Sequence, residues 1–62
     1  MRAEDFIGLS KRSAQDKAEE ANYIFRVVTS DGEVFLGPPS DVRTDRICCD
    51  LIGNVVVKAY VQ

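Results

Sequence analysis

Apolar residues recur along this chain at two different spacings, and each spacing predicts a different kind of element. In the first third, Ala14 and Ala18 lie on one face of a helical repeat, and the positions between them are charged or polar. Ser10 precedes this segment and carries the side-chain oxygen that favours a helix N-cap. We therefore predict a helix over residues 11–21, ended by Asn22 in a left-handed turn.

After the helix, apolar residues follow the alternation that is typical of β-strands. Residues 23–29 are rich in aromatic and β-branched side chains. The Asp31-Gly32 pair that follows favours a hairpin to a short strand over residues 33–36. Two further strands are predicted over residues 46–51 and 55–61. One helix followed by strands predicts an α+β domain, with a single helix packed on a three- or four-stranded mixed sheet.

The alternation also predicts which side chains form the core. In the third strand it turns Cys49 inward and Cys48 outward, so we expect one buried thiol and one exposed thiol. The expected core residues are Ala14, Ala18, Phe25, Val27, Ile47, Cys49 and Leu51.

Length and charge limit the class of protein. Sixty-two residues make one domain, residues 1–62, in which the polar residues 1–5 are expected to be loose. The formal net charge is −2, and the Lys and Arg residues are scattered, without the basic stripe of nucleic-acid binders. No apolar run approaches the ~20 residues of a membrane span, and the first residues turn acidic at once, unlike a signal peptide. We expect a cytoplasmic protein with no nucleic-acid and no membrane partner.

The residues that most often carry catalysis or bind metal are missing or isolated. Histidine is absent, which removes the commonest general base and metal ligand. Cys48 and Cys49 are adjacent, so on a strand they point to opposite faces and do not readily chelate one metal. Ser40 has no histidine to activate it, and Gly32 and Gly37 are not part of a phosphate-binding run. We expect no enzyme activity, no metal and no cofactor.

The connection before the third strand carries the strongest functional signal. The segment Gly37-Pro38-Pro39-Ser40-Asp41 is predicted to be a stiff, extended loop, because two successive prolines remove two ladder donors and fix two φ angles. The segment Arg43-Thr44-Asp45-Arg46-Ile47 follows it directly. A helix that comes first, a stiff loop and this Arg-x-Asp-Arg step resemble the potato inhibitor I family and small bacterial and phage proteins with a similar step.

The resemblance implies a scaffold that presents a rigid loop to a serine protease, with arginines from the strand below as its support. It places Arg46 at one supporting position and Cys48 where the family has its second support. Counting back from Arg46 makes Ser40 the primary specificity residue, whereas counting forward from Gly32 makes it Gly37, so both registers stay open.

The expected contact surface covers residues 37–46. Arg46 is expected to reach back to loop carbonyls, or to Asp41 or Asp45, in an exposed ion pair that contributes little to stability. The candidate partner-binding residues are Gly37, Pro38, Pro39, Ser40, Asp41, Val42 and Arg43, and the loop-support residues are Asp45 and Arg46.

Three functions are compatible with these features. The first is a small non-enzymatic protein-binding module of phage or bacterial type, with an unidentified protein partner that contacts the loop. The second is a serine-protease inhibitor that uses the same loop. The third is a self-assembling structural protein, because Val55-Val56-Val57 is strongly β-prone and an uncovered edge strand pairs with a second copy.

Overall fold

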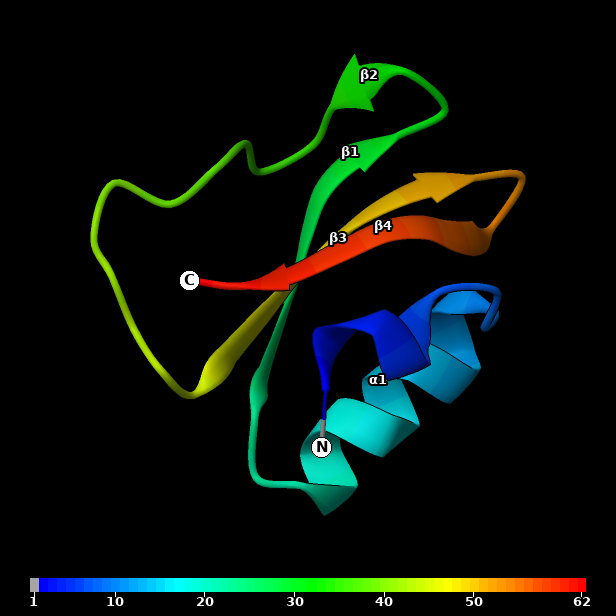
Figure 1. Cartoon of the computed structure of the whole chain (residues 1–62). Coiled ribbons are helices and arrows are strands. Elements are labelled where there is room, and N and C mark those ends of the chain that lie inside the picture. The colour runs from blue at the N-terminus through cyan, green and yellow to red at the C-terminus, as the bar shows by residue number, and fades with distance from the viewer. Residues whose placement is uncertain (1) are drawn as a thin grey trace.

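In the part of the chain that the structure describes, residues 2–62, one α-helix packs on a four-stranded mixed sheet (Figure 1). The predicted α+β class is therefore confirmed. The structure is a computed structural model. Its elements in chain order are the 3-10 helix η1 (Ala3–Phe6), the α-helix α1 (Lys11–Glu20), and the strands β1 (Ile24–Ser30), β2 (Glu33–Val34), β3 (Arg46–Ile52) and β4 (Val55–Val61).

The helix begins and ends close to the predicted residues. The Ser10 hydroxyl accepts a hydrogen bond from the Ser13 N–H at 3.2 Å, which confirms the N-cap. The last helical residue is Glu20, one residue before the predicted end, and Asn22 follows with a φ of 60° in the left-handed region. None of the described helices is long and apolar enough to cross a membrane.

The sheet has the order β2-β1-β3-β4, with β1 and β3 parallel at its centre and antiparallel strands outside. Asp31 and Gly32 have φ values of 53° and 83°, as the tight β1–β2 hairpin requires. β2 covers only Glu33–Val34, shorter than the predicted residues 33–36, because the chain bends at Phe35 and Leu36.

The core lies between one face of the sheet and the two helical segments, α1 and η1. Phe25 was expected in the core, but it is only partly buried and packs against the buried residues. Residues 3–6 form η1 where the sequence predicts a loose segment, and Phe6 from η1 is fully buried; Met1 lies outside the described residues. The buried cluster consists of Phe6, Ala14, Ala18, Val27, Ile47, Cys49, Leu51 and Val56.

The start of the outer strand β4 is covered by the chain itself. The Gly8 N–H donates to the Val56 carbonyl and the Val56 N–H donates to the Leu9 carbonyl, both at 2.8 Å. The expectation of an uncovered edge at residues 55–57 is therefore wrong at Val56, since both of its backbone groups already have partners.

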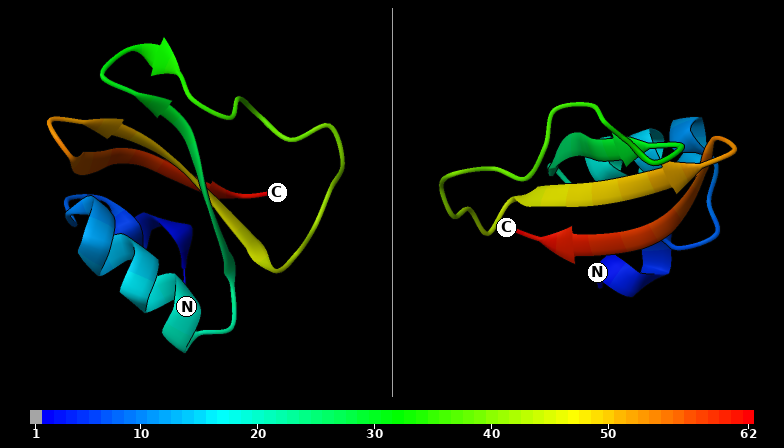
Figure 2. Two further views of the ribbon diagram at one scale, coloured as in Figure 1. Left: turned by 180° about the vertical axis from the view of Figure 1, so that it is seen from behind. Right: turned by 90° about the horizontal axis from the view of Figure 1, so that it is seen from above.

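Parallel pairing of β1 with β3 requires a connection that returns to the start of β3. The segment that does this is residues 35–45, named here the crossover loop. It leaves β2 and runs along the side of the sheet that faces away from α1 (Figure 2). The helix therefore packs on one face of the sheet, and the loop lies over the other.

Candidate binding loop and its anchors

Backbone hydrogen bonds hold both ends of the crossover loop against β1. The Gly37 N–H donates to the Val28 carbonyl at 3.2 Å, and the Ile24 N–H donates to the Asp45 carbonyl at 2.7 Å. The ladder between β1 and β3 shifts register at Val28, between Val27 and Thr29. Such a bulge turns backbone groups away from the regular ladder, and the Val28 carbonyl accepts hydrogen bonds from both Phe35 and Gly37.

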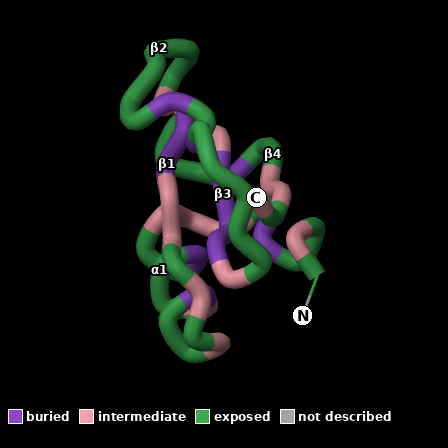
Figure 3. The backbone as a smooth tube through the Cα atoms, turned by 90° about the vertical axis from the view of Figure 1, so that its left-hand side faces the viewer, coloured by how far each residue is buried: buried purple, intermediate pink, exposed green. Residues whose placement is uncertain are grey.

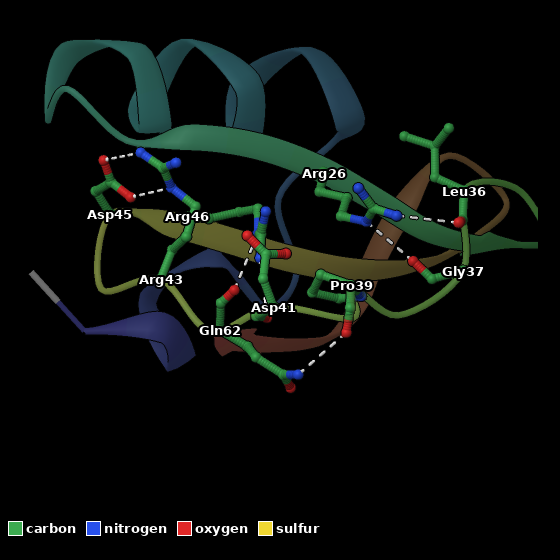
Figure 4. Close-up of polar contacts among 9 residues, drawn as sticks. All are labelled: Arg26, Leu36, Gly37, Pro39, Asp41, Arg43, Asp45, Arg46 and Gln62. Atoms are coloured by element: carbon green, nitrogen blue, oxygen red, sulfur yellow. Dashed lines mark hydrogen bonds and ion pairs between the residues drawn. The ribbon is translucent and has the colours of Figure 1, made fainter.

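Arg46 supports the C-terminal half of the loop from the first position of β3. Its guanidinium donates from Nη2 to the Asp41 carbonyl at 3.2 Å and to Asp41 Oδ1 at 3.0 Å (Figure 4). It also donates from Nε to the Gln62 carbonyl at 2.9 Å. The prediction that Arg46 reaches back to Asp41 is confirmed. The expectation of an exposed pair is wrong for Arg46, which is only 7% exposed because the loop and Gln62 cover it.

Arg26 supports the N-terminal half of the loop from the neighbouring strand. Its Nε donates to the Gly37 carbonyl at 3.0 Å, and its Nη2 donates to the Leu36 carbonyl at 3.1 Å (Figure 4). In the β1–β3 ladder, Arg26 lies directly opposite Cys48. The resemblance places the family's second support where this chain has Cys48, and Arg26 lies beside that position on β1.

A third contact reaches the middle of the loop from the end of β4. The Gln62 side chain donates from Nε2 to the Pro39 carbonyl at 3.4 Å, and the Gln62 N–H donates to the Arg46 carbonyl at 3.2 Å. Gln62 thus links the loop to the same arginine that holds Asp41. Three side chains hold successive parts of the loop: Arg26 within β1, Arg46 at the start of β3 and Gln62 directly after β4 (Figure 4).

The predicted contact residues divide into buried and exposed positions. Gly37 and Pro39 are buried, whereas Pro38 and residues 40–43 are exposed. The chain bends at Pro38 and again at Ser40 and Asp41, so residues 37–41, predicted to be extended, change direction along their length. Val42, at 82%, is the most exposed of the large apolar side chains among residues 2–62.

The charged side chains of the loop are paired within the loop or with its support. Arg43 makes a two-pronged contact with Asp45, from Nε to Oδ1 at 2.8 Å and from Nη2 to Oδ2 at 2.9 Å. Hydrogen bonding to Arg46 lowers the pKa of Asp41, and hydrogen bonding to Arg43 lowers the pKa of Asp45. The Asp45 carboxylate in turn raises the pKa of Arg43. These charges face one another and leave little uncompensated charge on the loop.

Cys48 is buried, and the expectation of an exposed thiol is wrong. It points away from the core, as the alternation predicts, but it is 0% exposed because the other face of the sheet is covered here. Its surroundings include Arg26, Arg46 and the backbone of Gln62, and loss of solvent raises the pKa of its thiol. Cys49, 0% exposed on the core side, has its pKa raised to about 12, mainly by burial.

Sequence reasoning missed Arg26 and Gln62. Arg26 had a signal, since it is a single charged residue inside the apolar run from Tyr23 to Val28. A charged side chain in a central strand needs partners, and the strand has only one such residue. Gln62 had no comparable signal.

Among residues 2–62, no cluster of three or more Cys, Asp or Glu side chains is arranged to hold a metal ion.

Comparison of the chain with protein-family models, with curated protein sequences and with solved structures gave no match. The assignment of a role to the crossover loop therefore depends on its geometry.

Proposed function

We propose that this protein is a small non-enzymatic protein-binding module that contacts a protein partner through residues 37–43 of the crossover loop. The observation that carries the proposal is the support of one exposed loop by buried or half-buried polar side chains from three strands. A loop that is held in one shape before binding loses less conformational entropy when a partner immobilises it.

Capture experiments with matched variants test this proposal. The immobilised protein is compared with a loop variant, Ser40→Arg combined with Val42→Glu, and with a helix variant, Gln15→Arg. All three positions are exposed, so the fold is expected to survive each change. A protein that binds the wild type and the helix variant but not the loop variant supports the proposal, and binding that all three chains share equally contradicts it.

A serine-protease inhibitor is the second candidate, and the contact between Arg46 and Asp41 favours it. Asp41 directly follows Ser40, so Arg46 holds the residue on one side of Ser40 while Gln62 holds the Pro39 carbonyl on the other. Exposure of Ser40 and burial of Gly37 favour the register in which Ser40 is the specificity residue. Such a segment, held on both sides of an exposed residue, is suited to binding in a protease active site. If the protease cuts the loop, the same contacts keep the two new chain ends in place and slow their release.

Arg46→Ala distinguishes an inhibitor from a passive substrate. If the loop inhibits by its rigidity, the variant is cut within residues 37–43 by a protease that the wild type inhibits, because the C-terminal half of the loop is no longer held. Equal inhibition by both chains, measured with the protease in trace amounts, would show that Arg46 has no part in inhibition.

A further inference from the structure

The edge of the sheet at β2 carries a run of exposed apolar side chains. β2 is the outermost strand on its side of the sheet, and residues 31–36 are all exposed, as the green tube around β2 shows (Figure 3). Val34 is 73% exposed, Phe35 62% and Leu36 56%. No other stretch of residues 2–62 exposes three consecutive large apolar side chains. An edge strand with such side chains is a template for pairing with another strand.

The backbone of this edge is open at Val34. Glu33 pairs with Ser30 across the two-residue turn, and the Phe35 N–H donates to the Val28 carbonyl at 2.9 Å. Backbone groups of successive strand residues point to opposite sides. The N–H and C=O of Val34 therefore point away from β1, toward the outer side of β2.

Two opposite charges lie on the helix side of the same edge. Glu33 and Phe35 are two positions apart, so their side chains project from one face of the strand. That face is the helix side, because the Lys11 ammonium at the start of α1 lies 5.9 Å from the centre of the Phe35 ring. Among residues 2–62, neither Glu33 nor Lys11 takes part in an ion pair.

From these features we infer that β2 pairs antiparallel with β2 of a second copy of this chain, about a two-fold axis at Val34. The two copies of Val34 exchange N–H···O hydrogen bonds across the axis. Glu33 of each copy then lies directly opposite Phe35 of the other, beside the Lys11 ammonium of that copy. One Glu33–Lys11 ion pair forms on each side of the axis. The contact lies outside residues 37–43 and does not depend on the proposed function.

The charges select this register and a second copy as the partner. Pairing centred on Glu33 would bring two carboxylates face to face, and pairing centred on Phe35 would bring the two Lys11 ammonium groups together. Like charges directly opposite each other destabilise a strand pair. Only the register centred on Val34 pairs unlike charges, and it does so twice by symmetry. A surface that complements itself after a two-fold rotation is what a symmetric dimer requires.

Sedimentation equilibrium tests the inference from about 10 μM to about 1 mM protein, because so short a contact is expected to be weak. We expect the wild type to dimerise in this range. Glu33→Lys and Lys11→Glu each bring like charges together on both sides of the axis, so each variant alone is expected to dimerise at least about 10-fold more weakly. Arg12→Glu, the same charge change at the next and exposed position of α1, is the control and is expected to match the wild type.

An equal mixture of Glu33→Lys and Lys11→Glu gives the sharpest result. In a mixed dimer the introduced lysine of one chain faces the introduced glutamate of the other, and the native Lys11 and Glu33 face each other on the second side. Dimerisation of the mixture is therefore expected to return to within about threefold of the wild type. Circular dichroism verifies that each chain is folded.

Three results would overturn the inference. A wild type that stays monomeric up to about 1 mM would show that β2 does not self-pair. Equal dimerisation of the wild type and both charge variants would place the contact on another surface. Weakened dimerisation in both variants without recovery in their mixture would contradict the pairing of Glu33 with Lys11.

Discussion

Arg46→Ala removes a buried side chain that holds the crossover loop, and its effect on stability follows from the hydrogen bonds that are lost. Arg46 is 7% exposed and donates to the Gln62 carbonyl at 2.9 Å. A hydrogen bond from a charged donor contributes about 1.5–3 kcal/mol to stability. We count this bond alone and expect the free energy of unfolding to fall by about 1.5–3 kcal/mol. A chain of this length has about 3–9 kcal/mol in total, so the variant is expected to fold with a much smaller margin.

Urea melts at neutral pH measure this loss, and Arg43→Ala provides a matched control. Arg43 is also an arginine paired with an aspartate, but its side chain is 45% exposed and its two hydrogen bonds go to Asp45 within the loop. Exposed ion pairs contribute little, so no resolvable change in the urea midpoint is expected for Arg43→Ala. Equal losses in the two variants would refute the idea that burial and the contact with Gln62 distinguish Arg46.

Three further predictions concern the core, the thiols and pH. Ile47→Ala is expected to lower the free energy of unfolding by about 2–5 kcal/mol, because Ile47 is fully buried, whereas Ile52→Ala on the same strand, 59% exposed, is expected to have a much smaller effect in the same urea melts. Cys48 and Cys49 are both expected to react slowly with a thiol reagent in the native protein and quickly in denaturant; rapid native labelling of Cys48 alone would show that the loop does not cover it. Because Arg46 lowers the pKa of Asp41, the charged carboxylate stabilises the native loop above the ordinary carboxyl range, and this contribution is lost as the pH falls through the lowered pKa. The difference in urea midpoint between the wild type and Asp41→Asn is therefore expected at neutral pH and is expected to disappear in acid.

Local patterns predicted the elements of this fold well. Ser10 and Asn22 identified the ends of α1 to within one residue, because capping depends on a few neighbouring groups. Alternation in β3 correctly placed Ile47 and Leu51 in the core, since only one side of a strand can face the helix.

The long-range contacts of the loop were harder to predict. Cys48 faces away from the core as predicted, but its burial depends on a loop that returns over the second face of the sheet. Arg26 lies 10 and 11 residues from the carbonyls it holds, and Gln62 lies 23 residues from Pro39. Such contacts depend on the pairing of β1 with β3 and on the path of the loop, neither of which is encoded in a local spacing. The Arg46–Asp41 contact was predictable because the two residues are only five positions apart in the sequence.

Backbone order in the free protein tests most directly whether the crossover loop is a preorganised binding surface. Order parameters from nuclear magnetic resonance relaxation can be measured at the amides of Gly37, Ser40, Asp41 and Val42, and compared with those of β3. Because Arg26, Arg46 and Gln62 hold the loop, the account predicts values near those of the strands, about 0.85, and a clear decrease in a combined Arg26→Ala and Arg46→Ala variant. Values below about 0.6 at these amides in the wild type would show a flexible loop and contradict the account.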